Sequence, residues 1–150
     1  MGVYKDHIKD ALPSIKKVRD LKKKLESKGV KYIYSNWIDF LGSPKTKPMP
    51  ISDFEDLCMG KGPQFAVHSV SFVPELTPAD NDQIPVPDLD SLMICPWDKT
   101  CAWVFADLYW NDRPYDVCPR LTLKKQIQKS AKSDLKFYVG IEPEFFLMKW

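Results

Sequence analysis

The chain has 150 residues, 44% of them hydrophobic and 28% charged, so it can bury a core and is too apolar to be disordered. Its 22 basic and 20 acidic residues leave a formal charge of +2, which argues against nucleic acid or an anionic membrane surface as a partner. No apolar run reaches the roughly 20 residues of a membrane span, and the N-terminal segment lacks the apolar centre of a signal peptide, so a cytoplasmic protein is predicted.

The first predicted element is an amphipathic helix over residues 14–27. Ser14 is the expected N-cap and Gly29 the expected stop. Lysines fill the face opposite the apolar stripe and are interpreted as solvated. The stripe has the three-and-four spacing of a helix: Ile15, Val18, Leu21 and Leu25.

A β-hairpin and a short helix follow. Alternating β-branched and aromatic residues predict a strand from Val30, and the turn at residues 42–44 predicts a hairpin. Pro48 and Pro50 lack ladder donors, so the returning strand is expected at an edge. A helix is predicted over residues 52–59.

The second half is expected to begin with an irregular segment over residues 60–90, interrupted by prolines. A long ordered loop is more often functional than idle. Two apolar segments, 91–95 and 100–110, predict central strands. A helix should start at Pro119 and run to residue 134, and residues 135–150 should form a last strand. The element order predicts an α+β fold.

Cysteine and histidine spacing argues against a zinc site. Four cysteines occur, none in a C-x-x-C pair: Cys58, Cys95, Cys101 and Cys118. Neither histidine stands at ligand spacing from them. Without a secretory signal, these cysteines are interpreted as buried reduced thiols rather than as a disulfide framework.

Two carboxylates stand in the predicted last strand. Alternation puts Glu142 and Glu144 on one face, about 6.5–7 Å apart and among apolar neighbours. A divalent cation such as Mg²⁺ or Mn²⁺ would compensate the two charges, since hard ions prefer oxygen ligands. The alternative is that this edge faces water or that each glutamate pairs with a lysine; the E-x-E pattern alone leaves both open.

The residues around this pair resemble a known family. Residues 140–147, GIEPEFFL, resemble the strand of the glutamine synthetase family that carries two metal-binding glutamates. Residues 37–56 resemble the early hairpin of that family, and residues 85–109 resemble its segment that ends in a strand with Asp. Residues 118–124 resemble its Asp-Pro-Arg segment, where the catalytic domain begins. The resemblance runs from about residue 30 to residue 150.

The resemblance implies a fold, a reaction and partners. The implied domains are an N-terminal tail and helix over residues 1–28, a β-grasp domain over 29–118, and the first helix and strand of a catalytic domain over 119–150. The implied enzyme is an ATP-dependent carboxylate–amine ligase that acts through γ-glutamyl phosphate, with ATP as co-substrate, Mg²⁺ or Mn²⁺ bound by Glu142 and Glu144, and glutamate and an amine as substrates. It also implies homo-oligomeric rings with active sites between subunits. The remaining ligands would lie beyond residue 150, so the isolated chain is expected to be inactive.

One departure from the family pattern concerns the amine. Glutamine-forming members carry an Asp-Gly-Ser-Ser stretch whose aspartate helps to bind ammonium, whereas this chain has Ala66 at that position. An apolar wall suits an organic amine better than ammonium. The segment 77–80 and the cysteine before Pro119 resemble the type III-like branch, which includes γ-glutamyl methylamide and anilide ligases. His68 and Ser69 are the other candidate residues on the amine side, although an ordinary polar loop residue is the favoured interpretation of His68.

Two other functions remain open at this stage. One is glutamine synthetase proper, which uses ammonium. The other is a stand-alone β-grasp interaction module without catalytic activity. The apolar last strand argues against the module, because such a strand needs sheet neighbours that the chain does not supply.

Overall fold

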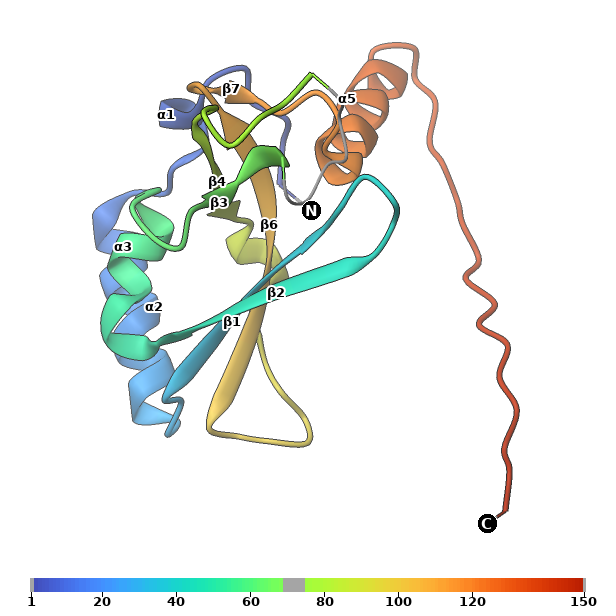
Figure 1. Cartoon of the computed structure of the whole chain (residues 1–150). Helices are drawn as coiled ribbons and strands as arrows, with labels where there is room; N and C mark the ends of the chain where they lie inside the picture. The colour runs from blue at the N-terminus through green and yellow to red at the C-terminus, as the bar shows by residue number, and fades with distance from the viewer. Residues whose placement is uncertain (1, 69–74, 150) are drawn as a thin grey trace.

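The computed structural model describes residues 2–68 and 75–149. Within these residues a curled sheet carries helices on its surface, and residues 135–149 run away from the sheet as an extended segment (Figure 1). The predicted mixture of helices and strands is therefore confirmed. No described helix is both long and apolar enough to cross a membrane.

The described residues form one seven-stranded sheet in the order β2-β1-β6-β4-β3, with β5 and β7 also paired to β6. Strands β1 and β6 are parallel, and the other pairs are antiparallel. The strand bounds are β1 Tyr32–Ile38, β2 Pro44–Pro50, β3 Phe65–Ala66, β4 Asp82–Pro87, β5 Met93–Ile94, β6 Cys101–Trp110 and β7 Arg113–Pro114.

The helices are short apart from two of thirteen residues, α2 and α5. Their bounds are α1 Ile8–Ala11, α2 Ile15–Ser27, α3 Phe54–Cys58 and α5 Pro119–Ala131, with 3₁₀ turns η1 at Ile51–Asp53 and η2 at Leu89–Ser91. Figure 1 shows α2 and α3 on the same side of the sheet.

Helix α2 forms as the sequence predicts. The Ser14 hydroxyl accepts a hydrogen bond from Lys17 N–H, and the chain leaves the helix through Gly29 at φ +82°, which a glycine adopts without strain. Its apolar stripe buries Val18 and Leu25 against Ile33 of β1 and Phe54 of α3. Full burial of side chains of this size contributes about 1.5–3 kcal/mol each, so this face holds α2 on the sheet.

The proline-rich region contains a strand that the sequence analysis missed. Strand β4 pairs with β6 although it contains Pro85 and Pro87. Pro85 and Pro87 are two residues apart, so the backbone nitrogens of both point to the same side of the strand, away from β6. The N–H groups that these prolines lack are therefore not needed for pairing with β6. Asp88, the next residue but one after Val86, donates its N–H to Phe105 O at 2.8 Å. Prolines therefore indicate where a strand lacks a neighbour, and they do not exclude the strand.

Other expectations are confirmed or corrected. The proline-bearing strand β2 lies at the sheet edge, as predicted. All four cysteines are buried and unpaired. The predicted helix over residues 52–59 starts two residues later, at Phe54, because a 3₁₀ turn occupies Ile51–Asp53.

The predicted last strand is wrong for this structure. Residues 135–149 are extended but pair with no described strand, and every one of them is exposed. A strand is stable only when a neighbour accepts and donates its backbone hydrogen bonds. Figure 1 shows this segment leaving α5 on its own.

Candidate functional site

Four charged side chains meet where α5 contacts the sheet. Asp88 follows β4, Asp107 lies in β6, and the cations come from the first two turns of α5, Arg120 and Lys124. All four side chains are largely buried, with 3% of Lys124 and 4% of Asp88 exposed. These four residues are called the charge cluster below.

Each cation of the charge cluster contacts both carboxylates. Lys124 Nζ lies 2.9 Å from Asp88 Oδ2 and 2.5 Å from Asp107 Oδ2. Arg120 Nε lies 3.0 Å from Asp107 Oδ1, and a second guanidinium nitrogen pairs with Asp88. The formal charges balance, two against two, as a buried group of ions requires. Arg120 and Lys124 are four residues apart, so one face of α5 presents both.

The N-terminal arm closes this cluster. Gly2 N–H donates to Asp88 Oδ2 at 3.0 Å, and a Cβ at Gly2 would lie 3.2 Å from Asp88 Oδ1. The arm approaches so closely because glycine has no side chain. Asp88 also caps η2 by accepting from Asp90 N–H at 3.2 Å. One carboxylate thus ties together the arm, the turn after β4 and α5.

The two carboxylates differ in acidity. Burial opposes ionisation of Asp88, but hydrogen bonds from Lys124 and Gly2 outweigh it and hold the pKa of Asp88 well below its usual range. Burial dominates at Asp107 and raises its pKa, with Lys124 and Arg120 offsetting only part of the effect. Asp88 is therefore the firmly ionised member of the pair.

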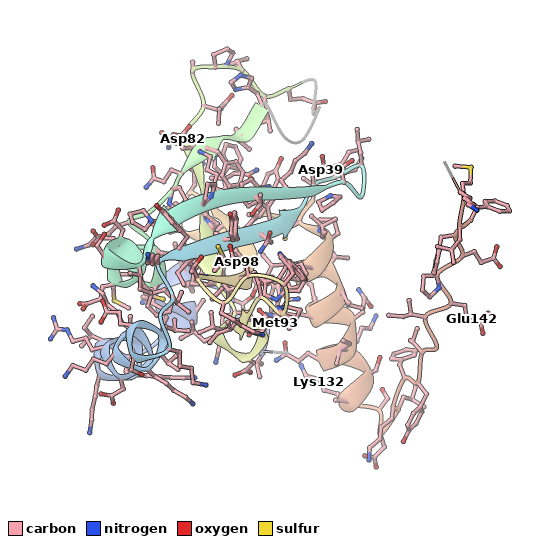
Figure 2. All side chains as sticks on the ribbon, turned by 90° about the horizontal axis from the view of Figure 1, so that it is seen from below. Asp39, Asp82, Met93, Asp98, Lys132 and Glu142 are labelled. Atoms are coloured by element: carbon pink, nitrogen blue, oxygen red, sulfur yellow. The ribbon has the colours of Figure 1, made fainter. Side chains whose placement is uncertain are left out.

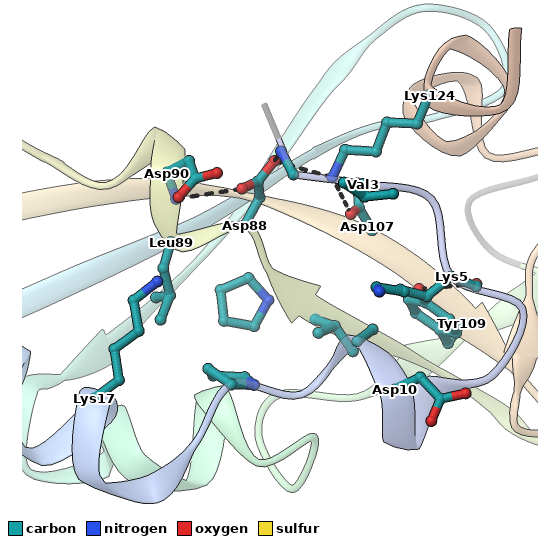
Figure 3. Close-up of a pocket in the computed structure, with 15 residues that line it drawn as sticks. Val3, Lys5, Asp10, Lys17, Asp88, Leu89, Asp90, Asp107, Tyr109 and Lys124 are labelled. Carbon is teal, nitrogen blue, oxygen red and sulfur yellow. Dashed lines mark hydrogen bonds and ion pairs between the residues drawn. The ribbon is translucent and has the colours of Figure 1, made fainter. Parts of the chain in front are cut away.

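A hollow of about 200 Å³ lies beside the cluster, between the N-terminal arm, β4, η2 and β6. Figure 3 shows Asp88, Asp107 and Lys124 joined at one end of it, with Asp90 beside Asp88 and Lys17 reaching towards Leu89. Tyr109 lines the same hollow and donates its hydroxyl to Lys5 O at 3.3 Å. The charged groups of the cluster are paired with one another, so they hold α5 in place rather than present a ligand site.

The sequence carried a signal for this cluster that the sequence analysis did not use. Asp88 and Asp107 both stand among apolar strand residues, where an unpaired carboxylate is costly. A cation pair four residues apart at the start of the next helix was the complementary signal. The family segments quoted above contain all four residues, but nothing in the sequence predicts that they meet.

The predicted amine-side residues lie in and directly after β3, at the end of the sheet opposite to β2. Ala66 is in β3 and is half-buried, next to Phe65, whose ring stacks on Trp37 with centroids 4.2 Å apart. His68 is half-buried, and among the described residues its Nδ1 has no hydrogen-bond partner. Ser69 lies outside the described residues. The structure thus places Ala66 and His68 in one short segment, whose buried residues Phe65 and Val67 belong to the same hydrophobic cluster as Leu121 of α5.

A carboxylate that the sequence analysis overlooked stands directly across from Ala66. The β3–β4 register pairs Ala66 with Asp82, and directly opposed residues in an antiparallel pair project to the same face with Cβ atoms about 4.5–5.5 Å apart. Asp82 is exposed (Figure 2). The wall beside Ala66 is therefore not wholly apolar.

The predicted metal ligands are not part of any site in the described residues. Glu142 and Glu144 lie in the exposed segment 135–149, and Figure 2 shows Glu142 far from the sheet. No group of three or more described His, Cys, Asp or Glu residues is arranged to hold a metal ion. Their role as metal ligands stays a prediction.

Comparison with known proteins gives consistent matches. The family profile described as glutamine synthetase, catalytic domain, matches residues 116–150. A glutamine synthetase of Rhizobium meliloti is 37% identical over 129 residues, which are 86% of this chain and 29% of the relative. A glutamate–methylamine ligase of Methyloversatilis universalis is 31% identical over 127 residues, 83% of this chain and 28% of the relative. A solved structure described as apo GmaS without ligand matches with a TM-score of 0.70 and 30% identity, over 77% of this chain and 27% of that one.

The matches show that the chain shares its mixed α/β scaffold with a family of ligases. The chain belongs to the glutamine synthetase family, as the resemblance in its sequence indicated. It spans less than a third of the length of the curated relatives it matches.

Proposed function

We propose that the chain is the N-terminal portion of an ATP-dependent ligase that joins the γ-carboxylate of glutamate to an amine through γ-glutamyl phosphate. The observation that carries the proposal is similarity to glutamine synthetases and to a glutamate–methylamine ligase over 83–86% of the chain. The chain spans 29% or less of those relatives, so the chain alone is expected to be inactive.

The proposal includes an architecture. The sheet with α2 and α3 would be a β-grasp domain over residues 29–118, preceded by residues 1–28, and residues 119–150 would begin the catalytic domain. The catalytic-domain match over residues 116–150 supports this division. The whole enzyme would be a cytoplasmic homo-oligomeric ring with active sites between subunits. In each subunit the charge cluster would hold α5 on the sheet of the same subunit.

Glu142 and Glu144 would bind Mg²⁺ or Mn²⁺ in this enzyme. Their carboxylate oxygens fit the preference of a hard divalent ion, although two ligands do not complete a coordination shell. Once bound, the ion would neutralise charge on the transferred phosphoryl group. Both glutamates would then need a fixed backbone, which a sheet neighbour for residues 135–149 would provide.

The amine is proposed to be organic rather than ammonium. Ala66 supports this preference because it replaces the aspartate of glutamine-forming members. The second candidate is ammonium, and Asp82 is the observation that favours it, since its carboxylate faces the same side as Ala66. The two candidates assign opposite roles to Asp82: a bystander in the first and the ammonium ligand in the second.

Competition assays on the longer protein that contains this chain would separate the candidates. We expect a higher kcat/KM for methylamine or aniline than for ammonium, and Ala66→Asp should shift the preference towards ammonium by about tenfold, or about 1.4 kcal/mol. Ala79→Asp, in the exposed turn after Thr77, is the matched control and should change nothing. A tenfold preference of the wild type for ammonium that disappears in Asp82→Asn would establish the second candidate instead.

A further inference from the structure

A second hollow lies on the sheet face opposite to α2. It has a volume of about 250 Å³ and belongs to the loop between β5 and β6 and to the adjoining strands. Its position follows from alternation: Ile33, Ala102 and Val104 point into the core beneath α2, so their neighbours Tyr34 and Trp103 point the other way. The lining residues are Tyr34, Asn36, Thr46, Cys95, Trp97, Asp98, Cys101 and Trp103.

Three aromatic side chains wall this hollow. Tyr34 and Trp103 are Cα partners in the parallel β1–β6 pair, and Trp97 meets Trp103 edge to face with ring centroids 5.9 Å apart. Trp97 is 73% exposed, which is unusual for so large an apolar side chain. Burial in the chain's own core therefore does not explain its position.

The fourth wall is a carboxylate. Asp98 Oδ1 accepts from Thr100 N–H at 2.9 Å and from the Thr100 hydroxyl at 2.7 Å. Its Oδ2 accepts only from the weak Cys101 thiol donor, at 3.3 Å, among the described residues. The hydrogen bonds from Thr100, with a smaller one from Cys101, lower the pKa of Asp98, so the group is ionised at neutral pH. Figure 2 shows Asp98 beside the β1–β2 hairpin.

None of the cations in the described part of the chain covers these rings. The cation–π contacts of the described residues are those of Lys47 with Phe65, Arg120 with Phe105 and Lys125 with Tyr4. Among the described residues no cation occupies the faces of Trp97, Trp103 or Tyr34, and Trp97 is exposed enough to receive one from outside. Electron-rich ring faces next to an ionised carboxylate are the arrangement that proteins use to bind organic ammonium groups.

We propose that this hollow binds a small organic ammonium ion, with its charge beside Asp98 Oδ2 and its alkyl groups against Trp97, Trp103 and Tyr34. Its volume is below the roughly 300–1,000 Å³ of sites for drug-sized ligands, so the ligand is small. The inference does not rest on the proposed ligase activity.

The test is a titration of the chain, kept soluble by Tyr138→Lys and Phe146→Lys in its exposed segment 135–149 and with its tryptophan indoles labelled with ¹⁵N. The ligands are choline and its neutral isostere 3,3-dimethylbutan-1-ol. The five tryptophans supply internal controls. The Trp97 and Trp103 indole signals should shift with choline. The Trp37 indole, stacked on Phe65, and the Trp110 indole, which donates to Asn81 O at 2.8 Å, should not shift.

Three variants sharpen the titration. Trp97→Ala removes an exposed ring and leaves the core intact, so it should weaken choline binding by about tenfold, measured at Trp103. Asp98→Asn keeps an acceptor for Thr100 N–H but removes the charge, and should weaken binding several-fold. Asp90→Asn, on the other side of the molecule, should leave it unchanged. Equal binding of the neutral isostere, an unchanged affinity in Asp98→Asn, or no shift of Trp97 at tens of millimolar choline would each overturn the proposal.

Discussion

Strand β6 and the segment 135–149 are both rich in aromatic and aliphatic residues, yet they have opposite environments in the structure. No residue of β6 is exposed, whereas every residue of 135–149 is. Strand β6 pairs with β1 on one side and with β4 on the other, and the segment pairs with none of the described strands. Sequence alone gives a segment the capacity to be a strand, but its neighbours decide whether it becomes one.

The same comparison applies to charge. In β6, Asp107 is buried because Arg120 and Lys124 meet it. In the segment, Glu142 and Glu144 are surrounded by solvent and need no compensation. Whether a carboxylate in a strand needs a cation beside it is therefore decided by the elements that enclose it.

The largest expected effect sharpens this comparison, because it tests residues 135–149 in a protein that would supply sheet neighbours for them. In the full-length ligase that we propose, Glu142→Ala or Glu144→Ala should abolish ATP-dependent ligation while the proposed oligomer stays intact, because a missing ligand misplaces the metal. Turnover at saturating Mg²⁺ or Mn²⁺ and gel filtration are the measurements. Glu26→Ala, an exposed glutamate of α2, is the control. Near-normal turnover in either variant would refute the metal assignment.

The sequence predicted what depends on local pattern. The Ser14 cap, the Gly29 stop, the Pro119 start of α5 and the edge position of β2 all follow from the chemistry of one or two residues. These features need no knowledge of what lies far away in the chain.

The sequence could not predict what depends on distant partners. The sequence analysis missed β4 because its two prolines are compatible with a strand only when their nitrogens point away from the neighbouring strand. That orientation is known only once β6 is known to pair with β4. The charge cluster joins residues up to 36 positions apart, from Asp88 to Lys124. Asp82 lies opposite Ala66 only because of the register between β3 and β4. The last strand was wrong for the same reason, since its neighbours are not among the described strands.

The next largest effect is expected when one of the cations that enclose Asp107 of β6 is removed. Lys124→Met keeps the length of the side chain but leaves Asp88 and Asp107 with one cation between them. Removal of one partner from a buried ion pair destabilises a protein by about 3–5 kcal/mol, so urea denaturation should show a loss of that order. Lys129→Met, an exposed residue on the same helix, should stay within about 0.5 kcal/mol of the wild type. Equal effects of the two substitutions would mean that the cluster does not hold α5.

A smaller effect should appear in the pH dependence of stability. The pKa of Asp88 is lowered in the folded state, so its stabilisation is present above the unfolded value of about 3.9 and is lost as the pH falls below it. The pKa of Asp107 is raised, so its contribution has the opposite sign: it increases as the pH falls through the raised folded value towards about 3.9.

Together the two aspartates should give a shallow gain in the free energy of unfolding on mild acidification and a loss below about pH 4. Asp107→Asn should remove the gain and keep the loss. Denaturation curves of both proteins at several pH values would check this, and a gain that persists in Asp107→Asn would have to come from another group.

The smallest expected effect concerns the segment itself. Deletion of residues 135–149 removes side chains that are all exposed, such as Phe146 at 95% and Tyr138 at 90%, so the urea midpoint should not change. Solubility should change, because a contiguous exposed apolar strand without neighbours promotes association between chains. Light scattering should show aggregation of the intact chain and its absence after the deletion, and Phe146→Lys with Tyr138→Lys should reproduce much of the improvement. A lower urea midpoint after deletion would mean that the segment packs on the sheet, and its difference from β6 would then be one of degree.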